Sequence, residues 1–231
     1  NPYRTIVDVE NFYGDSLAWE YQKRQYRYLI ARYGYSRSLG IWEIINEMNG
    51  TDGWQSGHHE EAFEWVDKVD NYLNRHDPHE RPTTASFSGA KWEYRPKLFN
   101  YTDVQNIHLY QNQGWYPVFK DNLLRSSMKN FAFASQRFWN NNEKPGLFGE
   151  TGYKHTYYGP KNENYTNVIH NALWSSLSNG LASTPLWWTV RLLSKEELKH
   201  YQGFSKFVSK IDFIQQSQKP FEVVNDEYDL Y

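Results

Sequence analysis

The stretch that decides the fold is Ile41-Trp42-Glu43-Ile44-Ile45-Asn46-Glu47. It is a short apolar run bounded by Gly40 on one side and by Asn49-Gly50 on the other. An apolar run without clean polar alternation is typical of a strand that is buried on both faces, as in a parallel sheet. The run nevertheless ends in an amide and a carboxylate. Ionised groups rarely end a buried strand unless a partner or a cleft needs them there.

The same pattern recurs later in Lys144-Pro145-Gly146-Leu147-Phe148-Gly149-Glu150-Thr151-Gly152. A short apolar strand again closes on a glutamate, and the glycines on both sides of it allow other groups to come close. Two carboxylates at the carboxyl ends of two buried parallel strands are the arrangement that glycoside hydrolysis requires.

Composition narrows the class of protein. The 231 residues are enough for one large domain, and 25 basic and 27 acidic residues nearly cancel, so nothing favours nucleic acid or a membrane surface as a partner. The absence of cysteine excludes disulfides, thiol catalysis and thiolate metal sites. No apolar run approaches the ~20 residues of a membrane span.

Aromatic residues are unusually frequent, at 18% of the chain. Sugar rings present apolar C–H faces that lie flat on indole and phenol rings, so this composition suits a carbohydrate-binding protein. The alternative is that the extra aromatic residues only enlarge the core and the surface.

Predicted strands and helices alternate along the chain, which indicates parallel βα units in one domain. The predicted strands are 41–47, 83–88, 103–110, 144–152 and 184–190, and the predicted helices are 17–33, 59–75, 118–140, 164–177 and 195–214. A closed eight-stranded barrel usually needs ~250 residues. The pattern therefore leaves two folds open, an open α/β sheet or the C-terminal part of a larger barrel.

Several stretches in this order resemble the clan A retaining glycoside hydrolases, in particular the cellulase-like enzymes at or near family 5. These stretches are 27–35 followed by 41–47, His108-Leu109-Tyr110, Phe148-Gly149-Glu150-Thr151-Gly152 and Leu186-Trp187-Trp188. The resemblance covers nearly the whole chain. It implies a (β/α)8 TIM barrel of which residues 1–231 form the C-terminal portion, about strands 4 to 8.

The resemblance also implies a mechanism and its residues. Glu47 is expected to be the general acid/base, Glu150 the nucleophile, and Asn46 a hydrogen-bond donor to the sugar 2-hydroxyl. In such enzymes one carboxylic acid protonates the leaving oxygen while the other attacks the anomeric carbon, and retention needs carboxyl groups ~5–5.5 Å apart. The alternative is two ordinary strand-end carboxylates in salt bridges.

Further substrate-binding residues are expected around these glutamates. His108 and Tyr110 share parity on one strand, and in the family the tyrosine hydroxyl binds the nucleophile; a core histidine and a core tyrosine are the alternative. Trp187 and Trp188 point to opposite sides of the last strand, so one is expected to form the floor of a sugar subsite. The remaining candidate platforms are Trp54, Trp92 and Trp115, with loop packing as their alternative.

No metal or other cofactor is predicted, because the spacing in His58-His59-Glu60-Glu61 suits no standard site. The expected partner is a carbohydrate substrate, and the family implies a secreted or periplasmic protein. We expect the first three βα units to lie in an upstream segment of the same gene or in a companion chain. The rival functions are a catalytically silent carbohydrate-binding barrel and an open-sheet binding protein.

Overall fold

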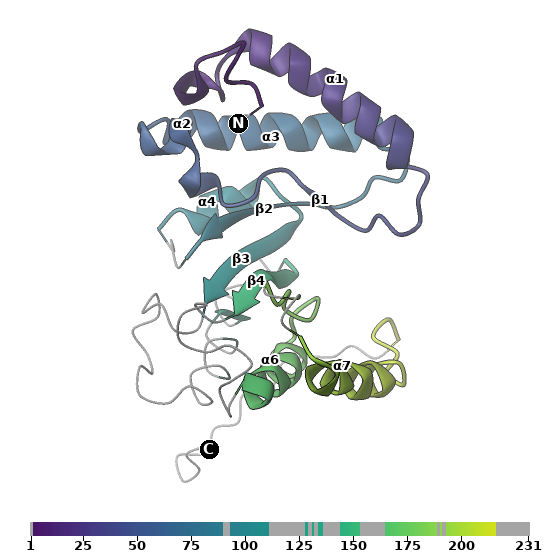
Figure 1. Ribbon diagram of the computed structural model, residues 1–231. Helices are drawn as coiled ribbons and strands as arrows, with labels where there is room; N and C mark the ends of the chain where they lie inside the picture. Colours follow the sequence, from purple (N-terminus) through teal and green to yellow (C-terminus); the bar gives the residue numbers. More distant parts are fainter. Residues whose placement is uncertain are drawn as a thin grey trace. The chain divides into compact units, whose positions relative to one another are not determined.

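The structure of the chain is a computed structural model. It describes residues 2–89, 93–110, 144–152, 165–188 and 193–215, together with the single positions 128, 131, 134, 135 and 190. The chain divides into two compact units, Asn1–His108 and Leu109–Tyr231. The described strands and helices of the first unit follow the alternation that the sequence predicts (Figure 1).

The first unit is built on parallel strands. β1 (Trp42–Glu43) pairs with β2 (Thr83–Ser88), and β2 pairs with β3 (Val104–Tyr110), whose last two residues belong to the second unit. The register places Glu43 beside Thr84 and Ser88 beside His108. Because all of these strands run in one direction, their carboxyl ends form a single edge.

Side chains on β2 and β3 alternate between a polar and an apolar face. Ser86 and Asn106 lie beside each other on the polar face, and Phe87 and Ile107 do so on the apolar face. All four are buried. The ring of Phe87 lies 5.0 Å from that of Trp54, which belongs to the short helix α2 (Asp52–Gln55). The apolar face is therefore the one that packs against helices.

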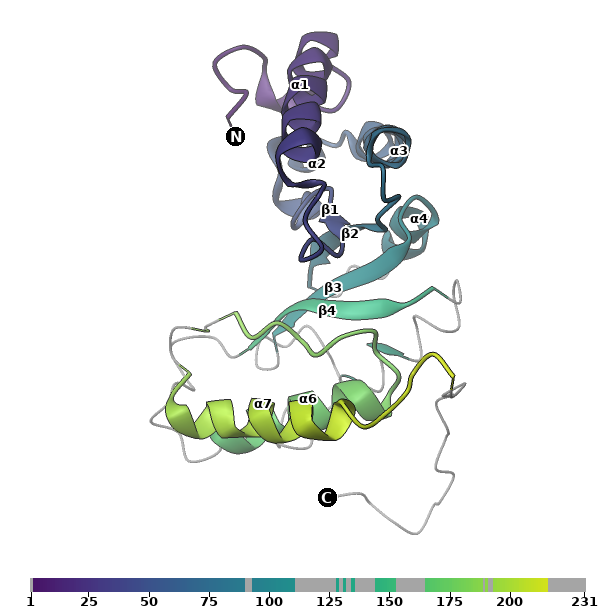
Figure 2. The same cartoon turned by 90° about the vertical axis from the view of Figure 1, so that its right-hand side faces the viewer.

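Helices α1 (Ser16–Tyr33), α3 (His59–His76) and α4 (Arg95–Asn100) lie on one side of these strands (Figures 1 and 2). Asp15 caps α1 by accepting a hydrogen bond from the amide of Ala18 at 2.7 Å. Two short 3-10 helices complete the unit, η1 (Val9–Asn11) and η2 (Met48–Gly50).

The second unit contains β4 (Gly146–Gly152), α6 (Tyr165–Ser178) and α7 (Lys195–Val208). Helices α6 and α7 pack side by side, as both views show (Figures 1 and 2). A capping box begins α7, in which Ser194 and Glu197 satisfy each other's backbone amides. In the part of the chain that the structure describes, no helix is long and apolar enough to cross a membrane.

Most predicted elements are confirmed to within one or two residues. These are the helices 17–33, 59–75 and 164–177 and the strands 83–88, 103–110 and 144–152. The predicted helix 118–140 lies outside the described residues, apart from positions 128, 131, 134 and 135, which are helical. The sequence did not indicate α2 and α4, which are too short to show a helical period.

The predicted strand 41–47 is wrong in length and in burial. β1 has two residues, although the pairing continues through a hydrogen bond from the Ser86 amide to the carbonyl of Ile45 at 3.1 Å. The chain then turns sharply at Glu47, which ends the strand. Glu43 is exposed and Trp42 is half-buried, whereas a strand buried on both faces was predicted. Within the described residues, β2 is the strand that pairs with β1.

Two predictions near the C-terminus also need correction. Within 184–190, the described residues form one isolated parallel bridge, between Trp187 and Thr151, and Pro185 lacks the amide hydrogen that a longer ladder would use. The predicted helix 195–214 ends at Val208, because the amides of Lys210 and Ile211 bond three residues back and tighten the last turn.

A buried ion pair between Arg81 and Asp77 connects several segments of the first unit. The Arg81 guanidinium binds the Asp77 carboxylate at 2.7 Å and donates to the carbonyls of Leu39 (2.8 Å) and Gly34 (2.6 Å). The Trp42 indole donates to the same carboxylate at 2.8 Å. Burial alone would raise the pKa of Asp77, but the hydrogen bonds from Trp42, the backbone and Arg81 outweigh burial and lower it.

We predict that Arg81→Met lowers the free energy of unfolding by about 3–5 kcal/mol, because it leaves the Asp77 carboxylate buried without its partner. Because the folded pKa of Asp77 is lowered, its stabilisation is present above the unfolded value of 3.8 and is lost as pH falls through the folded value. Urea unfolding at neutral and acidic pH measures both effects.

The matched control is Lys199→Met, which breaks the exposed pair with Glu196 and should cost at most about 1 kcal/mol. Equal losses for the two variants would contradict a structural role for the buried pair.

Candidate active site

Glu47 directly follows the β1 pairing and adopts an unusual backbone conformation. Its φ of 51° and ψ of 57° lie in the left-handed region, which few residues other than glycine adopt. Its amide donates to Ser86 Oγ at 3.0 Å. A backbone conformation of this kind costs roughly 1–3 kcal/mol and persists where the surroundings determine it, as at functional sites.

Ser86 connects Glu47 to a second carboxylate. Its hydroxyl accepts from the Glu47 amide and donates to Glu43 Oε1 at 3.0 Å. The Asn106 side-chain amide donates to the same oxygen at 3.4 Å. The turn that carries Glu47 is therefore held by a chain of polar groups from all three strands of the first unit.

The side chain of Glu47 contacts His108, which is buried. His108 Nδ1 lies 3.0 Å from Glu47 Oε1, while 35% of the Glu47 side chain remains exposed. Asn49, two residues further on, fixes η2 to the end of β2 through bonds with Ser88 of 2.7 Å and 3.2 Å. Asn46 is exposed. Glu47 thus has one oriented oxygen and access to solvent.

Glu150 lies within β4 in the second unit and is buried. Its Oε2 accepts a hydrogen bond from the Tyr110 hydroxyl at 2.9 Å, the contact that the family resemblance implies. Thr151 donates to the carbonyl of Leu109 at 2.9 Å. Gly152 follows at φ 151° with the Tyr110 ring against it, and a side chain at this φ would be strained.

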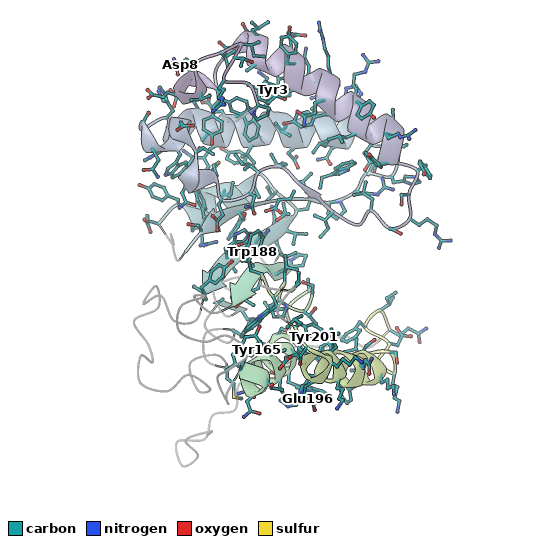
Figure 3. All side chains as sticks on the ribbon, viewed as in Figure 1. Tyr3, Asp8, Tyr165, Trp188, Glu196 and Tyr201 are labelled. Atoms are coloured by element: carbon teal, nitrogen blue, oxygen red, sulfur yellow. The ribbon has the colours of Figure 1, made fainter. Side chains whose placement is uncertain are left out.

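The two adjacent tryptophans occupy different surroundings. Trp187 is 1% exposed, and its indole donates at 3.0 Å to the hydroxyl of Tyr165, the first residue of α6, which Figure 3 labels. Trp188 is 53% exposed. Of this pair, only Trp188 presents a ring that a sugar can reach.

The candidate platforms in the loops fare differently. Trp54 is buried. Its ring stacks on that of His59 with 4.1 Å between the centroids and packs edge-on against that of Tyr94 at 5.0 Å, which favours the packing alternative. Trp92 and Trp115 lie outside the described residues.

The sequence did not identify two residues near Glu47, Glu43 and Ser86, as part of the site. Glu43 carried one signal, since it is a carboxylate inside an apolar run four residues before Glu47. Ser86 carried none, because a serine in a β-prone stretch shows nothing of its partners. Both act here through the backbone of Glu47, by way of the parallel register.

The comparisons with known proteins define the class of fold. Models of protein families and curated proteins gave no match. Among solved structures, an endo-β-1,4-mannanase from Thermotoga petrophila has a TM-score of 0.64 and 17% identity, over 96% of this chain and 55% of that chain. The likeness shows that the chain has the fold of part of a parallel α/β barrel.

Two β-glucuronidases show the same likeness. The enzyme from Ruminococcus gnavus has a TM-score of 0.59 and 14% identity, over 82% of this chain and 36% of that chain. The enzyme from Bifidobacterium dentium has a TM-score of 0.52 and 21% identity, over 76% and 28%. The chain thus spans between a quarter and about half of the length of these proteins, and at these identities the likeness concerns the fold.

We predict that Ser86→Ala lowers the free energy of unfolding by about 1–3 kcal/mol, because it leaves the Glu47 amide and the Glu43 carboxylate without the hydroxyl between them. Chemical denaturation measures the change. Ser38→Ala, at an exposed position, is the control and should change stability by less than about 0.5 kcal/mol. A loss at Ser86 no larger than at Ser38 would show that the hydroxyl does not hold this turn.

Proposed function

We propose that the protein is a retaining glycoside hydrolase that cleaves β-glycosidic bonds of a poly- or oligosaccharide, with Glu47 as general acid/base and Glu150 as nucleophile. One observation carries the proposal. Each glutamate contacts a side chain of β3 within its own unit, His108 for Glu47 and Tyr110 for Glu150. The barrel fold supports the proposal.

The surroundings of Glu150 suit a nucleophile. It is buried, and the Tyr110 hydroxyl fixes the orientation of its carboxylate. A nucleophile gains rate when it is held near the attacking geometry, because the reaction then requires no further ordering. In the proposed first step the carboxylate attacks the anomeric carbon and forms a glycosyl ester while the leaving oxygen departs.

The surroundings of Glu47 suit an acid that later acts as a base. As an acid it transfers its proton to the leaving oxygen, and as a base it removes a proton from the water that hydrolyses the ester. Both partners must reach the carboxyl group, and the Glu47 side chain is partly exposed. His108 holds one oxygen in place, so the other is the proposed site of proton transfer.

The proposed substrate contacts come from exposed groups. Asn46 is proposed to bind the sugar 2-hydroxyl, and Trp188 to stack on a sugar face. The similar structures are named as β-glucuronidases and a mannanase, so aryl β-glucuronides and β-1,4-mannan are the first substrates to test. A protein that binds these glycans but never cleaves them would instead be the silent carbohydrate-binding barrel.

We also propose that β1 gains a second neighbouring strand in the complete barrel. β1 pairs with β2 on one side, and its exposed Glu43 and half-buried Trp42 contrast with the buried residues of β2 and β3. Among the described residues β2 is the strand that pairs with β1, and a strand inside a closed barrel has a neighbour on each side. The further βα units would come from an upstream segment or from a companion chain.

We predict different losses for the two glutamates. Glu150→Gln should reduce kcat by a factor of about 10⁴ or more for every substrate, because no other group forms the glycosyl ester. Glu47→Ala should lose about 10²–10⁴-fold on substrates with poor leaving groups but form the ester normally from activated aryl glycosides. Azide should then restore turnover, since a small anion needs no general base. Equal loss on all substrates without azide rescue would contradict the role of Glu47.

We predict that the product first appears with the anomeric configuration of the substrate. Double displacement inverts the anomeric carbon twice, whereas a single displacement inverts it once and needs carboxyl groups ~6.5–9.5 Å apart. Proton NMR during the first minutes of hydrolysis distinguishes the anomers before they equilibrate. Initial release of the opposite anomer would rule out a glycosyl ester on Glu150 while leaving a glycosidase in place.

A further inference from the structure

We propose that His170 and His200 form a two-ligand site for a divalent transition-metal ion of the Zn²⁺, Ni²⁺ and Cu²⁺ class, which joins α6 to α7. The two rings belong to different helices of the second unit. Their Nδ1 atoms lie 2.9 Å apart, and the ring planes meet at 80°. The pair includes none of the proposed catalytic residues and does not depend on the proposed function.

The distance between the two nitrogens matches that of neighbouring ligands on one ion. Zinc–imidazole bonds are about 2.0–2.1 Å long, so two such ligands lie about 2.9 Å apart at a right angle and about 3.3 Å apart in a tetrahedron. Imidazole is a preferred ligand of Zn²⁺, Ni²⁺ and Cu²⁺. Without an ion, the same approach is a hydrogen bond in which one neutral ring donates and the other accepts.

Contacts on both sides of the pair hold it in place. One turn earlier on α6, Thr166 donates to Glu197 of α7 at 2.7 Å. One turn later, Trp174 packs edge-on against Phe204 at 5.4 Å. These contacts recur at intervals of three or four residues on both helices, so the helices run parallel in a fixed register. Ligands on two rigid, packed helices lose little freedom when an ion binds.

The site is open to solvent. His170 is exposed and His200 is half-buried, so an ion can enter and keep water in its remaining positions. On α7, Glu196 precedes His200 by one turn and is paired with Lys199 at 2.7 Å (Figure 3 labels Glu196). Among the described residues, no cluster of three ligating side chains includes this pair. The site therefore has two protein ligands.

The test is calorimetric titration of the intact 231-residue chain with Zn²⁺ at neutral pH, together with thermal unfolding with and without the ion. The wild-type chain should bind one more Zn²⁺ ion than the double variant His170→Ala/His200→Ala. Zn²⁺ should also raise its Tm, and a chelator should reverse the rise. The double variant His76→Ala/His79→Ala removes two exposed histidines elsewhere and should behave as wild type.

Single variants decide whether both rings act together. His170→Gln and His200→Gln should each weaken this site about tenfold or more, because each leaves a single imidazole. Both positions lie at the surface, so these variants remain measurable if the double alanine variant fails to fold. Wild-type affinity in either single variant would overturn the proposal. A wild-type Tm that Zn²⁺ leaves unchanged would also overturn it and assign the contact to a hydrogen bond alone.

Discussion

The parallel register of β1, β2 and β3 is the constraint on which the first unit depends. It places Glu43, Ser86 and Asn106 close enough for one hydroxyl to bind both a carboxylate and the amide of Glu47. A shift of one residue would turn the whole polar set toward the helices, because the side-chain period of a strand is two. Alternation thus serves two purposes here, since one face packs against helices and the other assembles a polar site.

Polar groups at the strand ends are costly unless each finds a partner. The buried Arg95 of α4 supplies donors to the carbonyls of Phe87 and Gly89 near the end of β2 and to that of Asn106 in β3. A guanidinium carries several donors in one plane, so one side chain can bind several carbonyl oxygens at once. These contacts join α4 to the carboxyl ends of β2 and β3.

The sequence predicted those features that depend on local pattern. The helix 59–75 and the strands 83–88 and 103–110 have a clear period, and the fold follows from their alternation. The length of β1 was missed, because the left-handed turn at Glu47 depends on Ser86, which is distant in sequence. The predicted strand 184–190 is reduced to one bridge among its described residues, although the amides of Leu186 and Trp188 bond to the carbonyls of Phe148 and Thr151.

The two tryptophans show why a site cannot be completed from pattern alone. Strand geometry requires that Trp187 and Trp188 face opposite ways, but it does not say which one faces inward. An indole N–H that enters a core needs an acceptor, since an unpaired buried donor costs about 1–3 kcal/mol. The Tyr165 hydroxyl provides that acceptor for Trp187 and leaves Trp188 exposed. A hydroxyl on α6 therefore determines which of the two tryptophan rings is exposed. The sequence of the strand alone does not contain this information, because it depends on how the helix packs against the strand.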